Sequence, residues 1–523
     1  MTLVNPRKNA EEMRSYRYFM DVTAPSIAGS FDVKFWLEEI PQACLADPAV
    51  WHAIVSLGSV YEYHATWAFT GHKPLKNEFA LQQFNTSIRH LTALPSSPAN
   101  KWKTLVISVI FTCICVLESL WDEARIHFRY GYTLLLELQG YQGSSVENLP
   151  IEDLNLEAGE DIYGSKAGAS TGDLVQLNTN FQSPVSLDSL KCILSAFELR
   201  EVALFSSVIR MPTILSDKDL YRAWQHYTVP SEPPGENLTT ENLFHANRAA
   251  QSLTNSFLVF SQDNAKELAT LFQAATEEGA TQDLFNFLAA KRAPLLQCFK
   301  DIEKAIEIFR RELGPESVAK AYSPGKAHER AQVRLAFLTL CLYHEMNRLT
   351  IDWQETEMVE GSISVSQQSC SHVLDLAEEA EALLNVLRAW GGGKPTPPSA
   401  PIMFPVMMVA FMGKSWEERR RGLRMMQRPR LEGFLEHQMS VSLSTAIMDR
   451  ELEVEIELAT EAAKEKGDKV PTEEELLEAR VNPMFKVTQT SIEFTGKRQA
   501  CLVLQTLHEA TNGLPGKTIH VNW

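Results

Sequence analysis

Three short motifs contain residue types that bind metal ions, bind phosphates or attack carbonyl groups in other proteins. His344 begins the zinc-protease pattern H-E-x-x-H, but Arg348 occupies the position of the second histidine, so one helical face cannot hold a metal ion. Residues 413–415 (GKS) end like a phosphate-binding loop, but Met408 replaces its first glycine. Residues 168–172 (GASTG) spell G-x-S-x-G in a polar stretch, whereas that motif requires a buried strand before it. We therefore predict no catalytic site, no cofactor and no enzymatic activity.

The eight cysteines are scattered singly through apolar stretches. None belongs to a C-x-x-C pair, and Cys113 and Cys115 point to different sides of the helix predicted around them. They are therefore predicted to be small buried hydrophobic residues, and the chain is predicted to hold no zinc ion.

The strongest local charge lies in residues 414–430 (KSWEERRRGLRMMQRPR), where seven cations face two glutamates. This composition indicates a contact surface for an acidic partner or for nucleic acid. An alternative, which we favour, is a helix whose arginines are solvated or pair with the acidic residues 451–461. The candidate partner-binding residues are Arg419, Arg420, Arg421 and Arg424.

A second candidate is the segment 146–162 (VENLPIEDLNLEAGEDI), which alternates acidic and apolar residues without a cation. This composition is typical of amphipathic disordered activation segments. It fits a solvated linker between helical units equally well. The apolar residues available to a partner are Leu149, Ile151, Leu154 and Leu156.

The elements that must position these residues are predicted to be helical almost throughout. Asp47 and Pro48 predict a helix start, after which Val50, Ile54 and Leu57 recur on one face. The apolar face of the next helix, over 80–94, is predicted to contain Leu81, Phe84, Ile88 and Leu91. Further helices are predicted near 102–120, 121–138, 184–209, 243–277, 281–313, 326–355, 366–390 and 415–460. Short turns between helices predict stacked antiparallel helical hairpins in a solenoid-like array.

The C-terminal part of the sequence is more mixed. Residues 451–458 (ELEVEIEL) alternate with period two, so a strand there competes with the helix that their neighbours favour. Residues 485–494 and 500–504, separated by a T-G-K turn, predict a β-hairpin. The predicted fold class is therefore mostly α with a small C-terminal β-hairpin. The predicted organisation is an N-terminal tail (1–20), an N-terminal helical unit (21–140), an acidic flexible linker (141–183), a main helical domain (184–460), and a charged linker with the β appendage (461–523).

Length and charge limit the class of protein. With 523 residues, the chain exceeds the ~250–300 residues at which a single core stops growing. Its net charge of −17 opposes non-specific binding to DNA or to an anionic membrane, so a nucleic-acid role would need a local basic patch. The N-terminus lacks the apolar segment of a signal peptide, and the longest apolar run, 105–117, is shorter than the ~20 residues that span a bilayer. We expect an intracellular protein without membrane contact.

Several of these stretches resemble the regulatory domain of fungal zinc-cluster transcription factors, the fungal-specific transcription factor domain. A late arginine-rich helix and turn of that family is similar to residues 420–433 here. The opening helices of the family are similar to 35–37 (FWL), 47–58 (DPAVWHAIVSLG), 80–91 (ALQQFNTSIRHL), 105–117 and 122–131 (DEARIHFRYG).

The resemblance implies an all-α regulatory domain, a nuclear location and control of RNA polymerase II transcription, often of one metabolic or secondary-metabolite gene cluster. Family members usually carry an N-terminal six-cysteine cluster that binds two zinc ions, but Cys44 is the only cysteine before Cys113. The zinc-cluster DNA reader is therefore absent from this sequence, and either the protein works without one or an upstream exon encodes it.

We accordingly expect no direct sequence-specific DNA binding. Regulation would act through contacts with other transcription factors or co-regulators, including a homodimer or a heterodimer with an intact family member. The alternative is a helical scaffold or small-molecule-binding protein of a biosynthetic gene cluster, with or without enzymatic activity.

Overall fold

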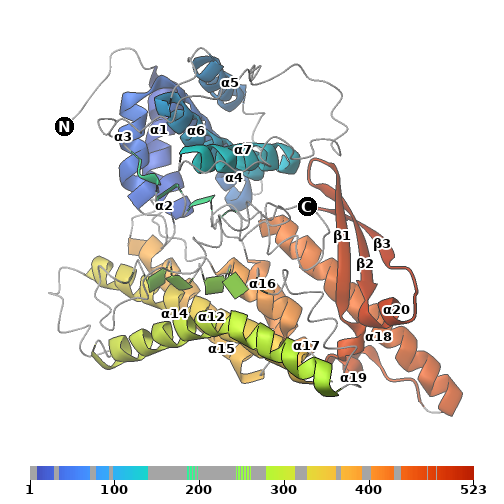
Figure 1. Cartoon of the computed structure of the whole chain (residues 1–523). Helices are drawn as coiled ribbons and strands as arrows, with labels where there is room; N and C mark the ends of the chain where they lie inside the picture. The colour runs from blue at the N-terminus through green and yellow to red at the C-terminus, as the bar shows by residue number, and fades with distance from the viewer. Residues whose placement is uncertain are drawn as a thin grey trace. The chain divides into compact units, whose positions relative to one another are not determined.

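A computed structural model of the chain describes residues 9–28, 34–70, 78–92, 98–138, single residues between 185 and 260, 278–312, 327–360, 367–390, 402–428, 437–467, 469–478 and 480–523 (Figure 1). The chain divides into two compact units, which are described separately below. The first unit is formed mainly by Asp32–Leu194 and the second mainly by Trp224–Trp523.

The N-terminal part of the chain is entirely helical in its described residues. Its elements are α1 (Ala10–Tyr18), a π-helical turn (Phe19–Thr23), α2 (Ala24–Ala28), a second π-helical turn (Phe35–Glu39), α3 (Ile40–Ala46), α4 (Pro48–Thr70), α5 (Glu78–Thr92), α6 (Pro98–Leu117) and α7 (Trp121–Leu138). In the first unit, α4 packs against α5 and α6, and α6 packs against α7. The start of α4 is capped as predicted, because Asp47 Oδ1 accepts a hydrogen bond of 2.8 Å from the Ala49 N–H.

Helix α6 is the central core helix of the first unit. Ile110 is fully buried, as are most of its neighbours in the predicted apolar run. By length and composition alone, residues Asn100–Leu117 would also be long and apolar enough to cross a membrane, but 67% of this stretch is buried inside the fold. Contacts with α4 on one side and α7 on the other account for that apolar surface.

Helix α5 forms as predicted, but its predicted apolar face is buried only in part. Leu91 is buried and Phe84 and Ile88 are half-buried, whereas Leu81 is 60% exposed. The other buried residues are small or polar, with the Ser87 hydroxyl donating to the Ala49 carbonyl at 2.8 Å. In return, the Ser56 hydroxyl donates to the Ala80 carbonyl, also at 2.8 Å. Small side chains let the two backbones approach closely enough for these hydroxyl bonds, and the larger apolar residues of α5 lie to one side.

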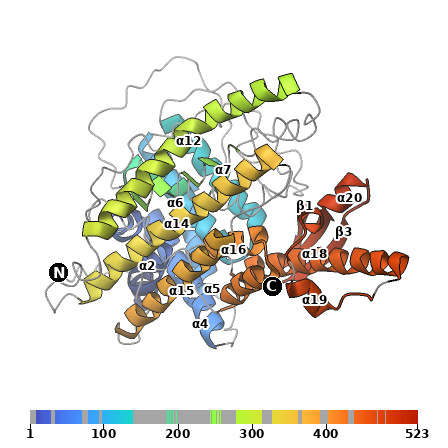
Figure 2. The ribbon, with the colours of Figure 1, turned by 90° about the horizontal axis from the view of Figure 1, so that it is seen from below.

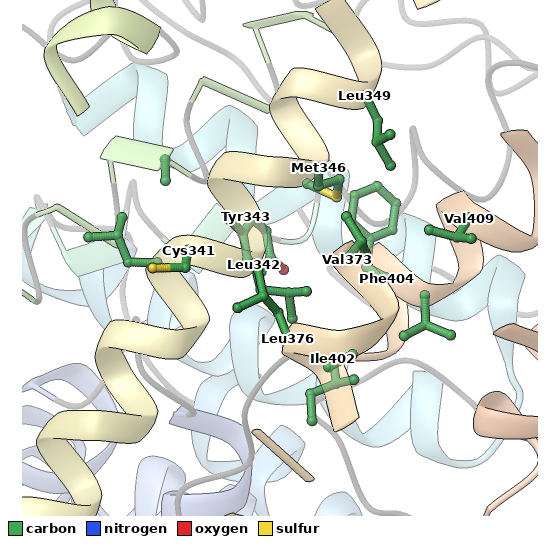
Figure 3. Packing of buried hydrophobic residues seen from close by; sticks show 14 of the residues in the cluster. Cys341, Leu342, Tyr343, Met346, Leu349, Val373, Leu376, Ile402, Phe404 and Val409 are labelled. Carbon is green, nitrogen blue, oxygen red and sulfur yellow. The ribbon is translucent and has the colours of Figure 1, made fainter. Parts of the chain in front are cut away.

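The second unit combines long helices with a small sheet. Its elements are α12 (Glu278–Glu312), α14 (Ala327–Glu360), α15 (Gln367–Trp390), α16 (Met403–Met412), α17 (Trp416–Met426), α18 (His437–Lys466), α19 (Glu473–Glu478), a 3₁₀ turn (Pro483–Phe485), β1 (Val487–Gly496), β2 (Gln499–Thr506), α20 (Leu507–Thr511) and β3 (Lys517–Asn522). Helix α14 packs against α12 and α15 (Figure 2). Helix α16 packs against α17. Figure 3 shows the core where α14, α15 and α16 meet, with Leu342, Leu376 and Phe404 among its buried residues.

The sequence pattern of residues 451–458 was compatible with either a strand or a helix. In the structure these residues are helical and lie within α18. The buried positions are Glu451, Val454 and Glu455, spaced three and four residues apart as a helix requires. The period-two alternation therefore places Glu453 and Glu457 on other sides of the helix.

The C-terminal β element is larger than predicted. The hairpin of β1 and β2 is confirmed, and β3 adds a third antiparallel strand in the order β1-β2-β3. Leu502 of β2 lies opposite Ile492 of β1 and Ile519 of β3. The prediction of a mostly helical chain of packed hairpins with a small C-terminal β element is confirmed.

Candidate functional site around helix α17

Helix α17 contains the arginine-rich stretch, and its ends explain why a helix forms there. The Ser415 hydroxyl accepts a hydrogen bond of 3.2 Å from the Glu418 N–H and so caps the first turn. Glu417 and Glu418 lie in that first turn and Arg424 in the last, which matches the helix dipole at both ends. The local sequence therefore favours a helix at the arginine-rich stretch, and packing of its buried face stabilises it.

Arg419 points into the core of the second unit and is fully buried. Its Nε donates a 2.6 Å hydrogen bond to the Ala410 carbonyl, and its guanidinium forms an ion pair with Glu451 of α18. Its guanidinium carbon also lies 4.9 Å from the centre of the Trp416 ring. Arg419 is therefore a structural residue that no partner can reach without unfolding this region.

Two further buried carboxylate contacts extend this network. Glu451 Oε1 accepts a 2.8 Å hydrogen bond from the Val487 N–H, at the start of β1. Glu455 accepts a 3.2 Å hydrogen bond from the Trp416 indole. Burial raises the pKa of Glu455, partly opposed by that hydrogen bond. The network links α17, α18 and the sheet.

Lys486 completes the network from the chain segment before β1. Its ammonium donates to the carbonyls of Met412 at 3.2 Å, Phe411 at 3.4 Å and Gly413 at 3.5 Å, at the C-terminal end of α16. Burial, followed by the positive charge of Arg419, lowers the pKa of Lys486 to about 8. These carbonyls carry the partial negative charge of the helix end, which is what stabilises a buried ammonium there.

Gly413 allows this close arrangement. A Cβ atom at Gly413 would lie 2.8 Å from the Val409 carbonyl oxygen and 2.9 Å from Cγ of Arg419. Any larger residue would push Arg419 away from the end of α16. The G-K-S letters at 413–415 therefore reflect helix packing in this structure.

The remaining arginines of α17 differ in exposure and pairing. Arg421 forms ion pairs with Asp375 at 2.7 Å and Glu378 at 2.8 Å, both on α15, and these carboxylates raise its pKa. Arg420 lies 4.0 Å from Glu473 of α19, and Arg424 is exposed. The acidic residues near α17 therefore come from α15 and α19 as well as from the predicted 451–461 segment.

The acidic and apolar candidates Leu149, Ile151, Leu154 and Leu156 lie outside the described residues, as does the G-x-S-x-G stretch. Their role as partner-binding residues stays a prediction. On α17, the prediction of partner binding now concerns Arg420 and Arg424, because these two arginines are exposed.

The H-E-x-x-R sequence of α14 forms an ion-pair cluster. Arg348 contacts Glu303 of α12 at 2.6 Å, and the His344 ring stacks on Phe299 with centroids 4.2 Å apart. The hydrogen bond with His344, followed by that with Arg348, lowers the pKa of Glu303 to about 2. Within the described residues, no group of three histidine, cysteine, aspartate or glutamate side chains is placed to hold a metal ion.

Sequence reasoning missed Lys486 and the carbonyl cluster that surrounds it. Lys486 is an isolated cation between Phe485 and Val487, and nothing in its neighbourhood signals burial. The end of α16 is brought to it only by the packing of α16 and α18.

The comparisons with known proteins find a similarity in the first part of the chain. Residues 14–181 match the family described as the fungal specific transcription factor domain, and no zinc-cluster family matches. The match spans the described helices α1 to α7 apart from the first residues of α1. These residues are therefore similar to the fungal specific transcription factor domain, the family that the sequence resemblance predicted. No curated protein and no solved structure matches the chain.

Proposed function

We propose that this protein regulates RNA polymerase II transcription in the nucleus through contacts with other proteins. The observation that carries this proposal is the fungal specific transcription factor domain at residues 14–181, a type of domain that is typically non-enzymatic. A metabolic or secondary-metabolite gene cluster is the kind of target that the family resemblance favours. The expected partners are co-regulators or other transcription factors, including an intact family member.

The acidic and apolar segment 146–162 is the contact region that we favour. It combines carboxylates with apolar side chains such as Leu149 and Leu154, a composition that fits binding to the groove of a partner protein. The competing stretch on α17 is less suited to an acidic partner, because Arg419 is buried and Arg421 already contacts two carboxylates.

A reporter experiment tests this proposal. The full chain is fused to an unrelated DNA-binding domain, and transcription of a reporter with the matching sites is measured. We expect the fusion to raise transcription and the L149A/I151A/L154A/L156A variant to lose most of this effect, since its charge is unchanged and only apolar contacts are removed.

A matched control replaces apolar residues in a part of the same region that is poor in acidic residues. The L174A/V175A/L177A variant lies in residues 167–183, where Asp173 is the one acidic residue. It is expected to keep full reporter activity. If the wild-type fusion is expressed and nuclear but does not raise reporter transcription, the scaffold or ligand-binding alternative would be favoured.

A further inference from the structure

Helix α5 exposes an apolar stripe at the edge of the first unit (Figure 1). The helix packs against α4 through the side that contains Ser87. On another side, Leu81 is 60% exposed, Ile88 is half-buried, and Asn85 between them is exposed. These three residues are spaced four and three positions apart, which is the spacing of residues along the contact between two paired helices. The exposed side of α5 therefore has the pattern of a helix-pairing surface.

The orientation of this stripe is fixed by packing within the first unit. The hydrogen bonds of Ser56 and Ser87 join α5 to α4 at two points. The ring of Phe84, next to the stripe, lies 4.1 Å from the ring of Phe111 on α6, measured between centroids. Leu91 is buried near the end of the helix. A partner would therefore meet a surface that is already in place, which lowers the entropic cost of binding.

The charges beside the stripe have opposite signs at its two ends. Glu78 lies in the first turn of α5 and Arg89 in the last, and both side chains are exposed. Eleven residues separate them, about three turns of 3.6 residues, so they lie on the same flank of the stripe about 16 Å apart. The Arg89 guanidinium contacts the Thr86 hydroxyl of its own helix at 2.9 Å. Among the described residues, no ion pair engages Glu78 or Arg89.

We propose that α5 binds α5 of a second copy of this chain as an antiparallel pair. A two-fold axis beside Asn85 places Leu81 of each copy against Ile88 of the other and brings the two Asn85 amides together at the centre. The same axis places Glu78 of each copy within about 4.5 Å, along the helix, of Arg89 of the other copy. Both ends of the pair therefore join a carboxylate to a guanidinium.

Charge complementarity selects the antiparallel direction. A parallel pair would place the two Glu78 carboxylates against each other, which is unfavourable. The central Asn85 fixes the register, because any shift along the helix would set its amide against an apolar side chain of the other copy. The stripe is therefore complementary to itself, as a two-fold contact between identical chains requires.

The size of the surface sets the strength of the pair. A single helix of 15 residues offers less area than the ~1,200–2,000 Å² of a standard interface. We therefore expect a weak dimer whose population depends on protein concentration. This inference does not rest on the proposed function: a chain that fails in the reporter experiment can still dimerise, and a monomeric chain can still activate the reporter.

Sedimentation velocity of the full chain between about 1 and 200 µM tests the inference. We expect the wild-type chain to change from monomer to dimer over this range. L81D removes both Leu81 contacts at once and should raise the dissociation constant at least about 50-fold. Because Leu81 is largely exposed in the single chain, the melting temperature of L81D at low concentration should equal that of the wild-type chain.

Charge reversal tests the direction and the register of the pair. E78R or R89E alone turns both ion pairs into like-charge contacts and should weaken the dimer about tenfold at 50 mM salt. The matched control is E123R, which makes the same change at an exposed glutamate in the first turn of α7. We expect E123R to change the dissociation constant by less than about twofold.

Mixing the E78R and R89E chains provides the decisive measurement. One chain then has arginine and the other glutamate at both positions, so a mixed antiparallel pair has opposite charges at both ends. We expect the mixture to dimerise about as well as the wild-type chain although each variant alone does not. A wild-type chain that stays monomeric to 200 µM, equal weakening by E78R and E123R, or a mixture no more dimeric than its components would overturn the proposal.

Discussion

At the scale of single residues, Lys486 shows how a buried charge can be tolerated without a carboxylate partner. Among the described residues, no carboxylate lies within ion-pair distance of its ammonium, which contacts three carbonyls at the end of α16. Arg419 satisfies a fourth carbonyl, that of Ala410. Together the two cations satisfy the carbonyls that the helix end leaves without partners, and they tie β1 to α16.

This arrangement predicts a specific dependence of stability on pH. The pKa of Lys486 falls from 10.5 to about 8 on folding. Between these values the unfolded chain binds more protons than the folded chain, so the free energy of unfolding rises with increasing pH. The contribution of Lys486 to this rise is roughly 3 kcal/mol, complete above about pH 10.5. Urea unfolding of the wild-type chain and of K486M from pH 7.5 to 10.5 measures it as the difference between the two curves.

The comparison with K486M matters because cysteines and tyrosines also titrate in this range. Burial raises the pKa of Cys298 to about 11 and that of Tyr18 to about 12, and both remain in K486M. Parallel curves for the two proteins would contradict the burial of Lys486.

At the scale of elements, α6 shows why the first unit depends on one helix. Replacing Ile110 by Asp places a charge without a partner in the contact between α6 and its neighbours. We expect a loss of several kcal/mol, comparable with the ~5–15 kcal/mol stability of a whole domain. Thermal unfolding followed by circular dichroism measures it.

The matched control for this substitution is I126D on α7, where Ile126 is 39% exposed. A charge there stays solvated, so the melting temperature should change little. If the I110D variant has the same melting temperature as the wild-type chain, α6 must be exposed on the isolated chain, for example as a contact in a dimer or with a membrane.

The sequence predicted helices better than it predicted their buried faces. The predicted buried residues of α4 were correct, because large apolar residues such as Ile54 and Leu57 recur at helical spacing. The predicted buried face of α5 was correct only in part, because the contact of this helix with α4 depends on hydroxyl hydrogen bonds by Ser56 and Ser87. Hydrophobic periodicity cannot signal a contact made by small polar residues.

Among the strands, β3 was missed for a related reason. Its six residues, KTIHVN, are short and mostly polar, so they give little signal without a neighbour. They become a strand because β2 supplies hydrogen-bonding partners and α18 covers Val521. Tertiary context therefore decides the third strand, whereas the T-G-K turn already predicts the first two.

At the scale of the whole molecule, charges far apart in the sequence neutralise one another. Helix α15 supplies Asp375, Glu378 and Glu381, which face Arg421 and Arg428 near the end of α17. The sequence predicted carboxylate partners only in residues 451–461, because it could not show that α15 and α17 are neighbours. Partner-binding surfaces are therefore harder to predict than helices, since they consist of the charges that packing leaves exposed.

The division into two compact units predicts separate unfolding. Each unit has its own buried core, so each can unfold cooperatively without the other. Differential scanning calorimetry of the full chain should resolve two transitions. I110D should lower the transition of the first unit alone. R419M, which leaves Glu451 buried without its cation, should lower the other transition, at a cost of ~3–5 kcal/mol.

The assignment of each transition follows from which variant moves it, because the two substitutions lie in different units. If the units unfold independently, the I110D/R419M double variant shows both shifts at their single-variant sizes, since distant and uncoupled sites are additive. If a single transition responds to both substitutions instead, the two cores unfold as one cooperative structure. Because each unit buries its own apolar residues, we expect two transitions and additive shifts.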